Sequence, residues 1–141
     1  MKEQLITFNT AKLAKEKGFN WGCNYFYTPD KKPYITRGYE YRSDAYVEDH
    51  NWNAGMGSYP TKASDVLCSA PTQSLLQKWL REEHKINVES NYLPNIQKYS
   101  CLYIPMRGKA CISDRKYVSK LKFDTYEEAL EEGLQEALKL I

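Results

Sequence analysis

Apolar residues recur every three or four positions in three segments of the chain, and this period predicts three helices. The first covers residues 7–19. Thr7 can cap its first turn, Gly18 can end it, and Phe19 can then fold back onto the last turn. Its apolar stripe is narrow and consists of Phe8, Ala11 and Ala14.

The second helix is predicted over residues 70–86, because its Pro-Thr pair suits a helix start. Its apolar side chains fall on one face, at Leu75, Leu76, Trp79 and Leu80. The third is predicted over residues 124–141, where Thr125 and Glu128 have the spacing of a capping box. Its expected buried face consists of Tyr126, Leu130, Leu134, Ala137 and Ile141.

Runs of aromatic and β-branched residues between the helices predict strands. Two runs flank Asp30, Lys31 and Lys32, which can connect a hairpin, and two more flank a turn at residues 107–109. Residues 48–65 are rich in Asn, Gly, Pro and Ser and predict a long loop, a kind of segment that often carries function. The expected strands are residues 23–29, 33–41, 86–93, 98–106 and 116–123.

The order of these elements is helix, two or three strands, helix, three strands, helix, which predicts an α+β fold. We expect the three helices to pack on one face of a mostly antiparallel, tyrosine-rich sheet. With 141 residues the chain is long enough for one core, and it contains neither an internal repeat nor a linker. Residues 1–141 are therefore predicted to form a single domain.

The composition excludes some classes of protein. A formal net charge of +2 is too near neutral to indicate nucleic acid or an anionic membrane by itself. The sequence has no run of about 18 apolar residues for a membrane span, and its polar start lacks the apolar segment of a secretory signal. We therefore expect a cytoplasmic protein with reduced thiols. Its cysteines do not have the close spacing of a zinc site; they are Cys23, Cys68, Cys101 and Cys111.

Residues 21–59 contain 10 of the 19 aromatic residues of the chain. One interpretation is structural, because rings on alternating strand positions can fill the space beneath covering helices. The other is a binding face, because Tyr and Trp bring a large area to an interface at low entropic cost. Both sides of the expected hairpin carry rings, and a sheet covered on one side leaves some of them exposed. The partner-binding residues of this second interpretation are Trp21, Tyr25, Tyr27, Tyr39, Tyr41 and Trp52.

A second candidate surface is basic. Residues 98–122 contain seven Lys and Arg side chains against Asp114 alone, with tyrosines between them that can stack on bases. The alternative function is thus a nucleic-acid- or nucleotide-binding module. Its residues would be Arg107, Lys109, Arg115, Lys116, Lys120 and Lys122. The structural alternative is that these charges neutralise the acidic third helix or protect a sheet edge.

Candidate catalytic groups are few. His50 follows Glu48 and Asp49, but neighbouring residues on one loop seldom converge on a substrate. Cys111 lies among basic residues, as a reactive thiolate would, although a small buried role explains it as well. His84 closes the second helix, where a cation is favourable. The sequence has neither a P-loop nor a dinucleotide-binding glycine motif, so no enzyme and no cofactor are predicted.

Three segments carry a resemblance: TAKLAKEKGF at residues 10–19, APTQSLLQKWLREEH at residues 70–84 and TYEEALEEGLQEALKLI at residues 125–141. There the chain resembles a widespread family of short uncharacterised proteins encoded by Bacteroidales bacteria and by their phages and prophages. The resemblance implies a cytoplasmic protein of a bacterial host cell, with a constant helical frame and variable tyrosine-rich segments between. It implies no activity, cofactor or catalytic residue.

From these observations we expect a non-enzymatic accessory protein of the phage or prophage type. It would bind a host protein or a small molecule through its aromatic hairpin and loop. Self-association is a further expectation, because leftover aromatic surface pairs readily with itself. No membrane partner is expected.

Overall fold

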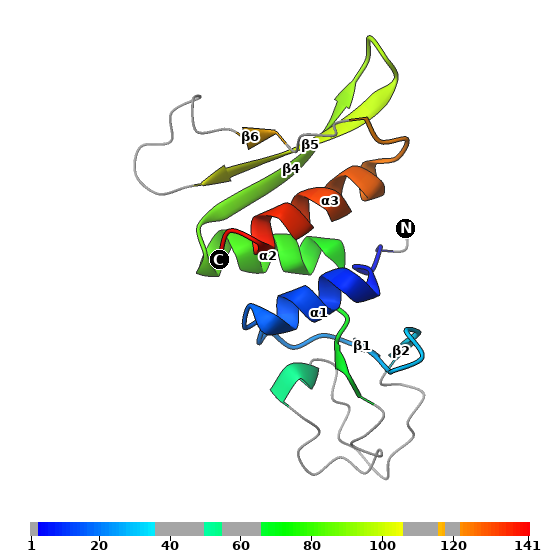
Figure 1. Cartoon of the computed structure of the whole chain (residues 1–141), viewed down its shortest axis with the longest axis vertical. Helices are drawn as coiled ribbons and strands as arrows, with labels where there is room; N and C mark the ends of the chain where they lie inside the picture. The colour runs from blue at the N-terminus through cyan, green and yellow to red at the C-terminus, as the bar shows by residue number, and fades with distance from the viewer. Residues whose placement is uncertain (1–2, 36–49, 55–65, 106–115, 118–121) are drawn as a thin grey trace. The chain divides into compact units, whose positions relative to one another are not determined.

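The fold is known from a computed structural model, which describes residues 3–35, 50–54, 66–105, 116–117 and 122–141 (Figure 1). The described helices and strands are α1 (Phe8–Glu16), β1 (Tyr25–Tyr27), β2 (Pro33–Ile35), the 3-10 turn η2 (Trp52–Ala54), β3 (Cys68–Ser69), α2 (Gln73–Glu83), β4 (Ile86–Leu93), β5 (Lys98–Pro105), β6 (Lys116–Tyr117) and α3 (Tyr126–Leu138). The fold is α+β, as predicted. Its described strands form two antiparallel sheets, in the orders β2-β1-β3 and β4-β5-β6, where the sequence suggested one.

The chain consists of two compact units. The C-terminal unit comprises Met1–Gln4 and Gln73–Ile141, and the N-terminal unit comprises Leu5–Thr72. Each unit contains one of the two sheets, so each is described by itself below. The single domain expected over residues 1–141 stays a prediction.

Helix α3 packs against β4, β5 and α2 in the C-terminal unit. Its N-terminus is capped as predicted, because the hydroxyl of Thr125 accepts a hydrogen bond from the N–H of Glu128 at 3.2 Å. Tyr126, expected on the buried face, is instead 43% exposed. The buried face is wider than predicted, since α3 contacts a sheet and a helix at once, and consists of Ala129, Leu130, Gly133, Leu134, Ala137 and Leu138.

Helix α2 packs against β4 and α3. At its first turn the buried Gln73 donates hydrogen bonds from Nε2 to the carbonyl of Glu127 and to a carboxylate oxygen of Glu131, both at 2.9 Å. These two bonds hold the start of α2 on α3. The apolar face agrees with the prediction, with Leu75 half-buried and Leu76, Trp79 and Leu80 buried.

Strands β4 and β5 form a long antiparallel hairpin, paired without interruption from Ile86↔Pro105 to Leu93↔Lys98. The bounds of β4 are those predicted from its alternation, and β5 ends one residue earlier than predicted. Of the predicted third strand, the structure describes β6, which pairs with β5, and residues 122–123. The turn predicted at residues 107–109 lies outside the described residues.

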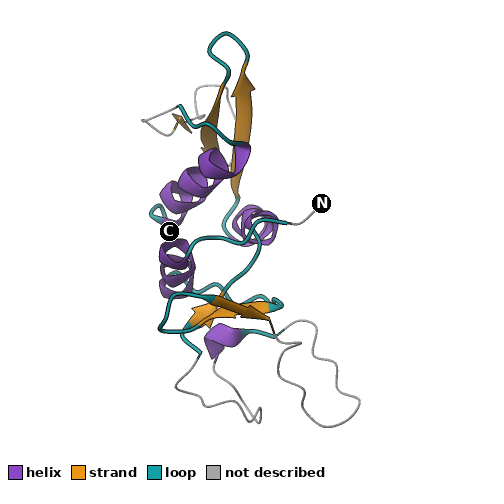
Figure 2. Cartoon of the chain, turned by 90° about the vertical axis from the view of Figure 1, so that its right-hand side faces the viewer, coloured by secondary structure: helices purple, strands orange, loops and turns teal. Residues whose placement is uncertain are grey.

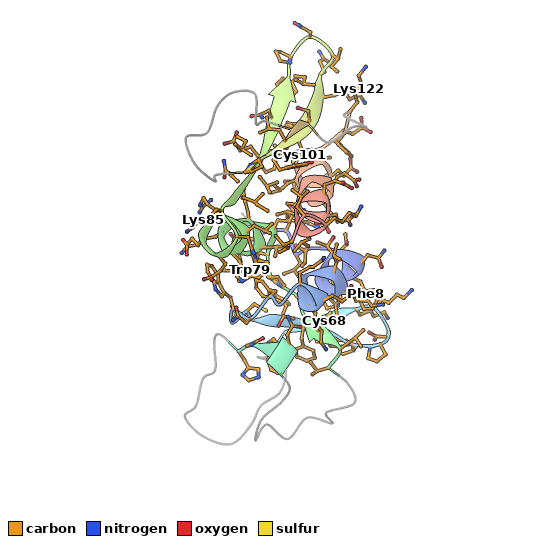
Figure 3. All side chains as sticks on the ribbon, turned by 60° about the vertical axis from the view of Figure 1, so that its left-hand side comes forward. Phe8, Cys68, Trp79, Lys85, Cys101 and Lys122 are labelled. Atoms are coloured by element: carbon orange, nitrogen blue, oxygen red, sulfur yellow. The ribbon has the colours of Figure 1, made fainter. Side chains whose placement is uncertain are left out.

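Helix α1 begins and ends as predicted in the N-terminal unit. The hydroxyl of Thr7 accepts from the N–H of Thr10 at 3.4 Å, and the N–H of Phe19 donates to the carbonyl of Ala14 at 2.9 Å. Gly18 has φ +87°, the left-handed conformation that favours glycine at a helix C-terminus. The helix contacts β3, and Figure 3 labels Phe8 on α1 and Cys68 on β3.

The predicted hairpin of β1 and β2 is confirmed, with Phe26 opposite Tyr34. Asp30 organises its turn: the carboxylate accepts hydrogen bonds from the N–H of Lys32 at 2.9 Å, the hydroxyl of Tyr34 at 2.7 Å and the hydroxyl of Thr28. The Thr28 and Tyr34 hydroxyls and the Lys32 N–H all favour the carboxylate, so they lower the pKa of Asp30.

Of the predicted loop at residues 48–65, the structure describes residues 50–54, and hydrogen bonds attach them to the N-terminal unit. The N–H of Cys23 donates to the carbonyl of His50 at 3.0 Å. The side-chain amide of Asn53 donates to the carbonyl of Phe19 at 2.8 Å and accepts from the N–H of Ser69 at 2.9 Å. This part of the loop therefore has a structural role.

Candidate binding surface

Tyr27, one of the six aromatic residues predicted to bind a partner, belongs to the core of the N-terminal unit. Its ring is buried and meets the ring of Phe8 edge-on, with centroids 5.5 Å apart. Its hydroxyl donates a hydrogen bond of 2.6 Å to the carbonyl of Ile6. Tyr27 thus joins the sheet to α1 and to the segment that precedes it.

Trp52 is the second of the six to lie in the core. Its Nε1–H donates to the carbonyl of Cys23 at 3.0 Å, and its ring centroid lies 4.7 Å from that of Phe26, which is fully buried. Strand β1 therefore buries rings on both faces, with Tyr27 against Phe8 of α1 and Phe26 against Trp52. The expectation that a one-sided sheet leaves rings uncovered was wrong for these residues, because the second face is covered by η2.

The remaining predicted aromatic residues are placed less deeply or lie outside the described residues. Trp21 and Tyr25 are half-buried. Tyr39 and Tyr41 lie outside the part of the chain that the structure describes. Tyr34, which was not among the six, is 38% exposed at the edge of this sheet. The structure does not bring the six together as one exposed face.

The basic candidate surface is described only in part. Lys116 lies in β6, where its backbone pairs with Tyr103, and Lys122 is exposed shortly before α3 (Figure 3). Lys98, at the start of β5, forms an ion pair with Asp124. The other predicted residues, Arg107, Lys109, Arg115 and Lys120, lie outside the described residues.

Three tyrosines of the C-terminal unit form an aromatic cluster with exposed members: Tyr92 of β4, Tyr99 of β5 and Tyr126 of α3. Tyr92 and Tyr99 are cross-strand partners with ring centroids 5.1 Å apart. The ring of Tyr126 stands perpendicular to that of Tyr99 at 6.3 Å. Tyr92 is 51% exposed, Tyr126 is 43% exposed and Tyr99 is half-buried between them. We call these three residues the tyrosine surface.

Backbone contacts hold the tyrosine surface in place. Tyr99 and Phe123 exchange both backbone hydrogen bonds, at 2.9 and 3.0 Å, and so attach the segment before α3 to β5. The hydroxyl of Ser90 donates to the carbonyl of Tyr126 at 3.2 Å, and Thr125 caps the helix at the same end. The β4–β5 hairpin extends past this end of α3 (Figures 1 and 2). The rings of Tyr92 and Tyr126 are exposed there.

The chemistry of this surface suits recognition. Each tyrosine offers a flat apolar ring and a hydroxyl that can donate or accept a hydrogen bond. The turn that joins β4 to β5 adds the exposed Ile96 and Gln97. The Lys98–Asp124 ion pair beside Tyr99 is internally neutral. Rigid aromatic rings beside adaptable amides are the composition of protein-binding loops.

The catalytic candidates have structural surroundings where they are described. His50 exchanges backbone bonds with Cys23, and its ring meets that of Trp52 edge-on at 4.5 Å. The ring of His84 meets Trp79 in the same way, also at 4.5 Å. Cys111 lies outside the described residues. Within the described ranges, no three His, Cys, Asp or Glu side chains are grouped so that they could hold a metal ion.

Two described thiols lie in surroundings that disfavour the thiolate. Burial raises the pKa of Cys68 to about 11 and that of Cys101 to about 12, because a thiolate would lose its hydration there. Both side chains are fully buried. A nucleophilic cysteine needs the opposite conditions, partial exposure and a lowered pKa.

Sequence reasoning missed Tyr92 and Tyr126 as exposed residues. The alternation of β4 places Tyr92 on the same face as the buried Ile86 and Val88, and the helical period of α3 placed Tyr126 on its apolar face. Both patterns predict burial. The signal available in the sequence was length, because β4 runs eight residues, and a strand that long can outreach the helix that covers it.

Comparisons of the chain with protein-family models, curated proteins and solved structures found no match. Among the described helices, none is long and apolar enough to cross a membrane. The arrangement of the residues therefore carries the functional argument.

Proposed function

We propose that this chain is a non-enzymatic accessory protein of the phage and prophage type that binds a protein partner of its bacterial host through the tyrosine surface. The observation that carries the proposal is that Tyr92 and Tyr126 are exposed although ring contacts to Tyr99 hold both of them. Exposed rings that are already ordered lose little conformational entropy on binding. Tyrosine is also enriched among the residues that dominate binding energy at interfaces.

A protein partner is favoured over nucleic acid by the charge around these rings. Lys98 is neutralised by Asp124, and the exposed Glu127 and Glu128 follow Tyr126 in the first turn of α3. Nucleic-acid affinity depends on uncompensated Lys and Arg side chains that displace counterions from phosphates. A surface of mixed charge with aromatic rings at its centre is typical of protein interfaces.

The assignment to phages and prophages rests on the resemblance of the three helical segments. What the resemblance implies, and what we propose, is a location in the cytoplasm of a Bacteroidales host cell. Fractionation of such a cell that expresses the tagged protein would test this location. Recovery of the protein in the membrane or secreted fraction would contradict it.

The binding proposal is tested by affinity capture from a Bacteroidales lysate with three baits: the wild type, the Tyr92→Ala/Tyr126→Ala double variant and a Leu140→Ala control. Leu140 is 51% exposed in the same unit but follows the opposite end of α3. We expect a protein captured by the wild type and the control to be lost with the double variant. Calorimetry with that purified protein should then give at least about tenfold weaker binding for the double variant. Equal capture by all three baits would contradict the proposal.

A small-molecule ligand would be revealed by native mass spectrometry of the purified protein at low salt. Extra mass that disappears on denaturation, in the wild type and in the double variant alike, would show a bound small molecule. The proposed protein partner would then be given up in favour of that ligand. A native mass equal to that of the protein alone would show that no small molecule is bound, and the ligand would then be a macromolecule.

One observation supports the nucleic-acid alternative. The exposed Lys122 directly precedes Phe123, and the backbone of Phe123 is hydrogen-bonded to that of Tyr99. It predicts that a labelled single-stranded oligonucleotide binds at low salt and is released steeply as salt rises. Lys116→Ala and Lys122→Ala should then reduce the slope of that salt dependence. Absence of binding at low salt would dispose of this alternative.

A further inference from the structure

Among the described strands, β4 lies at the edge of its sheet, because the strand order is β4-β5-β6. An edge strand presents backbone N–H and C=O groups that can pair with another strand. Natural edges are usually protected by proline, lysine or a bulge. From Ile86 to Leu93 the strand has neither proline nor lysine, its pairing with β5 is uninterrupted, and Glu89 is its only charged residue.

The hydrogen bonds of Tyr99 show which residues of β4 direct their backbone N–H and C=O groups away from β5. Tyr99 directs both its N–H and its C=O to Phe123, away from β4. The pair Tyr92↔Tyr99 is therefore one of the pairs without mutual hydrogen bonds, so the backbone groups of Tyr92 point away from β5. Because such pairs alternate along an antiparallel ladder, the same holds for Ser90, Val88 and Ile86.

Part of this edge is already occupied. The side-chain amide of Gln77 in α2 donates to the carbonyl of Val88, which confirms that this carbonyl faces outward. Within the described part of the chain, β5 is the only strand beside β4. Ser90 and Tyr92 therefore present four outward backbone groups, two on each residue, at the end of the hairpin that extends past α3 (Figure 1).

We propose that this edge pairs in antiparallel fashion with the same edge of a second copy of the chain, about a two-fold axis at Asn91. In this register Ser90 lies opposite Tyr92 of the second copy, and each pair exchanges two backbone hydrogen bonds. Every outward group of Ser90 and Tyr92 is then satisfied in both copies. The interface joins the two β4–β5–β6 sheets into one continuous sheet.

Three features of the chain fit a second copy as the occupant. Glu89 would lie opposite Leu93, so no like charges meet across the interface. The next outward residue, Val88, would lie opposite Pro94, which has no N–H to donate. The carbonyl of Val88 needs no such donor, because it already accepts from Gln77. The pairing thus ends at Val88, whose outward carbonyl already has a hydrogen-bond donor within the same chain.

The first test replaces Ser90 by proline. The N–H of Ser90 faces outward, so Ser90→Pro removes a bond of the proposed interface in each copy and none of the β4–β5 ladder. Ser90→Ala is the matched control, because both variants lose the side-chain bond to Tyr126 while alanine keeps the N–H. Sedimentation velocity over a range of concentrations should give dimers for the wild type and Ser90→Ala. Ser90→Pro should dimerise at least about tenfold more weakly.

A second test does not require that β4 folds normally with a proline in it. Asn91 is exposed and would face Asn91 of the second copy across the axis, so Asn91→Asp and Asn91→Lys each place like charges together. We expect each variant alone to be monomeric and their equimolar mixture to form heterodimers, at low salt. A monomeric wild type at high protein concentration, or a mixture no more associated than its components, would overturn the proposal.

These outcomes are separable from those of the proposed function. Tyr126 has no part in the paired edge, so Tyr126→Ala should leave the dimer unchanged while it weakens partner capture. A wild type that is monomeric but still captures a partner through the tyrosines would overturn the dimer alone. A dimer that captures nothing would overturn the binding function alone.

Discussion

Gly133 of α3 lies directly against Cys101 of β5, close enough that a Cβ atom on Gly133 would overlap the Sγ of Cys101. The same Cβ would lie 3.0 Å from Cγ1 of Val88 and 3.1 Å from Cβ of Cys101. In Figure 3, Cys101 lies where β5 passes α3. The absence of a side chain at Gly133 therefore determines how closely α3 approaches the sheet, and with it the place where Tyr126 meets Tyr99.

We expect Gly133→Ala to lower the free energy of unfolding by about 3 kcal/mol, because overpacking a fully buried contact outweighs the gain in helix propensity. Urea denaturation followed by circular dichroism would measure it. Combining Gly133→Ala with Cys101→Ala should recover part of the loss, since the overlapping sulfur is then gone. A Gly133→Ala protein as stable as the wild type would show that α3 can move away from β5 at no cost.

The buried thiols should make the protein less stable in alkaline solution. The ordinary pKa of a cysteine thiol is 9.0, whereas folding raises it to about 11 for Cys68 and about 12 for Cys101. Above pH 9 the unfolded chain loses these protons while the folded chain keeps them. The stabilisation is therefore complete below pH 9 and is lost progressively as the pH rises towards the folded values.

Comparison with Cys101→Ala isolates this effect, because other groups titrate in the same range in both proteins. We expect the stability difference between the wild type and Cys101→Ala to change in favour of the variant as the pH rises from 9 to 11. Iodoacetamide at pH 8.5 should label Cys68 and Cys101 only when their units open. Rapid labelling of the folded protein would refute the burial of these thiols.

Tyr27→Phe tests the core role of a residue that the sequence suggested for binding. It leaves the buried carbonyl of Ile6 without its donor, and we expect it to lower the free energy of unfolding by about 1–2 kcal/mol. Tyr25→Phe, at a half-buried neighbour, should change it by less than about 0.5 kcal/mol. Thermal and urea denaturation of both variants would measure this difference. Partner capture that fails with Tyr27→Phe at unchanged stability would restore its role in binding.

Asp30 should titrate below its ordinary pKa of 3.8, because Thr28, Tyr34 and Lys32 all donate to its carboxylate. Its contribution to stability is thus present above pH 3.8 and is lost as the pH falls through the folded value. Tyr34→Phe removes one donor, so we expect the titration midpoint of Asp30, followed by NMR of its carboxyl carbon, to rise. An unchanged midpoint would mean that the Tyr34 hydroxyl does not bind this carboxylate.

The sequence by itself determined the local structure. Caps and periods are encoded within a few residues, which is why the Thr7 and Thr125 caps, the left-handed Gly18, the Asp30 turn and the bounds of β4 were all predictable. The α+β class followed from the order of these elements.

Only the tertiary structure decided which aromatic rings are buried. Alternation tells which residues share a face, but it does not tell whether that face is covered, since the cover comes from distant segments. Trp52, 26 residues beyond Phe26, covers one face of β1 and buries Phe26, whereas Phe8 of α1 covers the other face and buries Tyr27. Conversely, β4 extends past α3, so Tyr92 and Tyr126 are exposed although their patterns predict burial. The candidate site therefore lies where a covering element ends, and that boundary is set by packing between segments far apart in the chain.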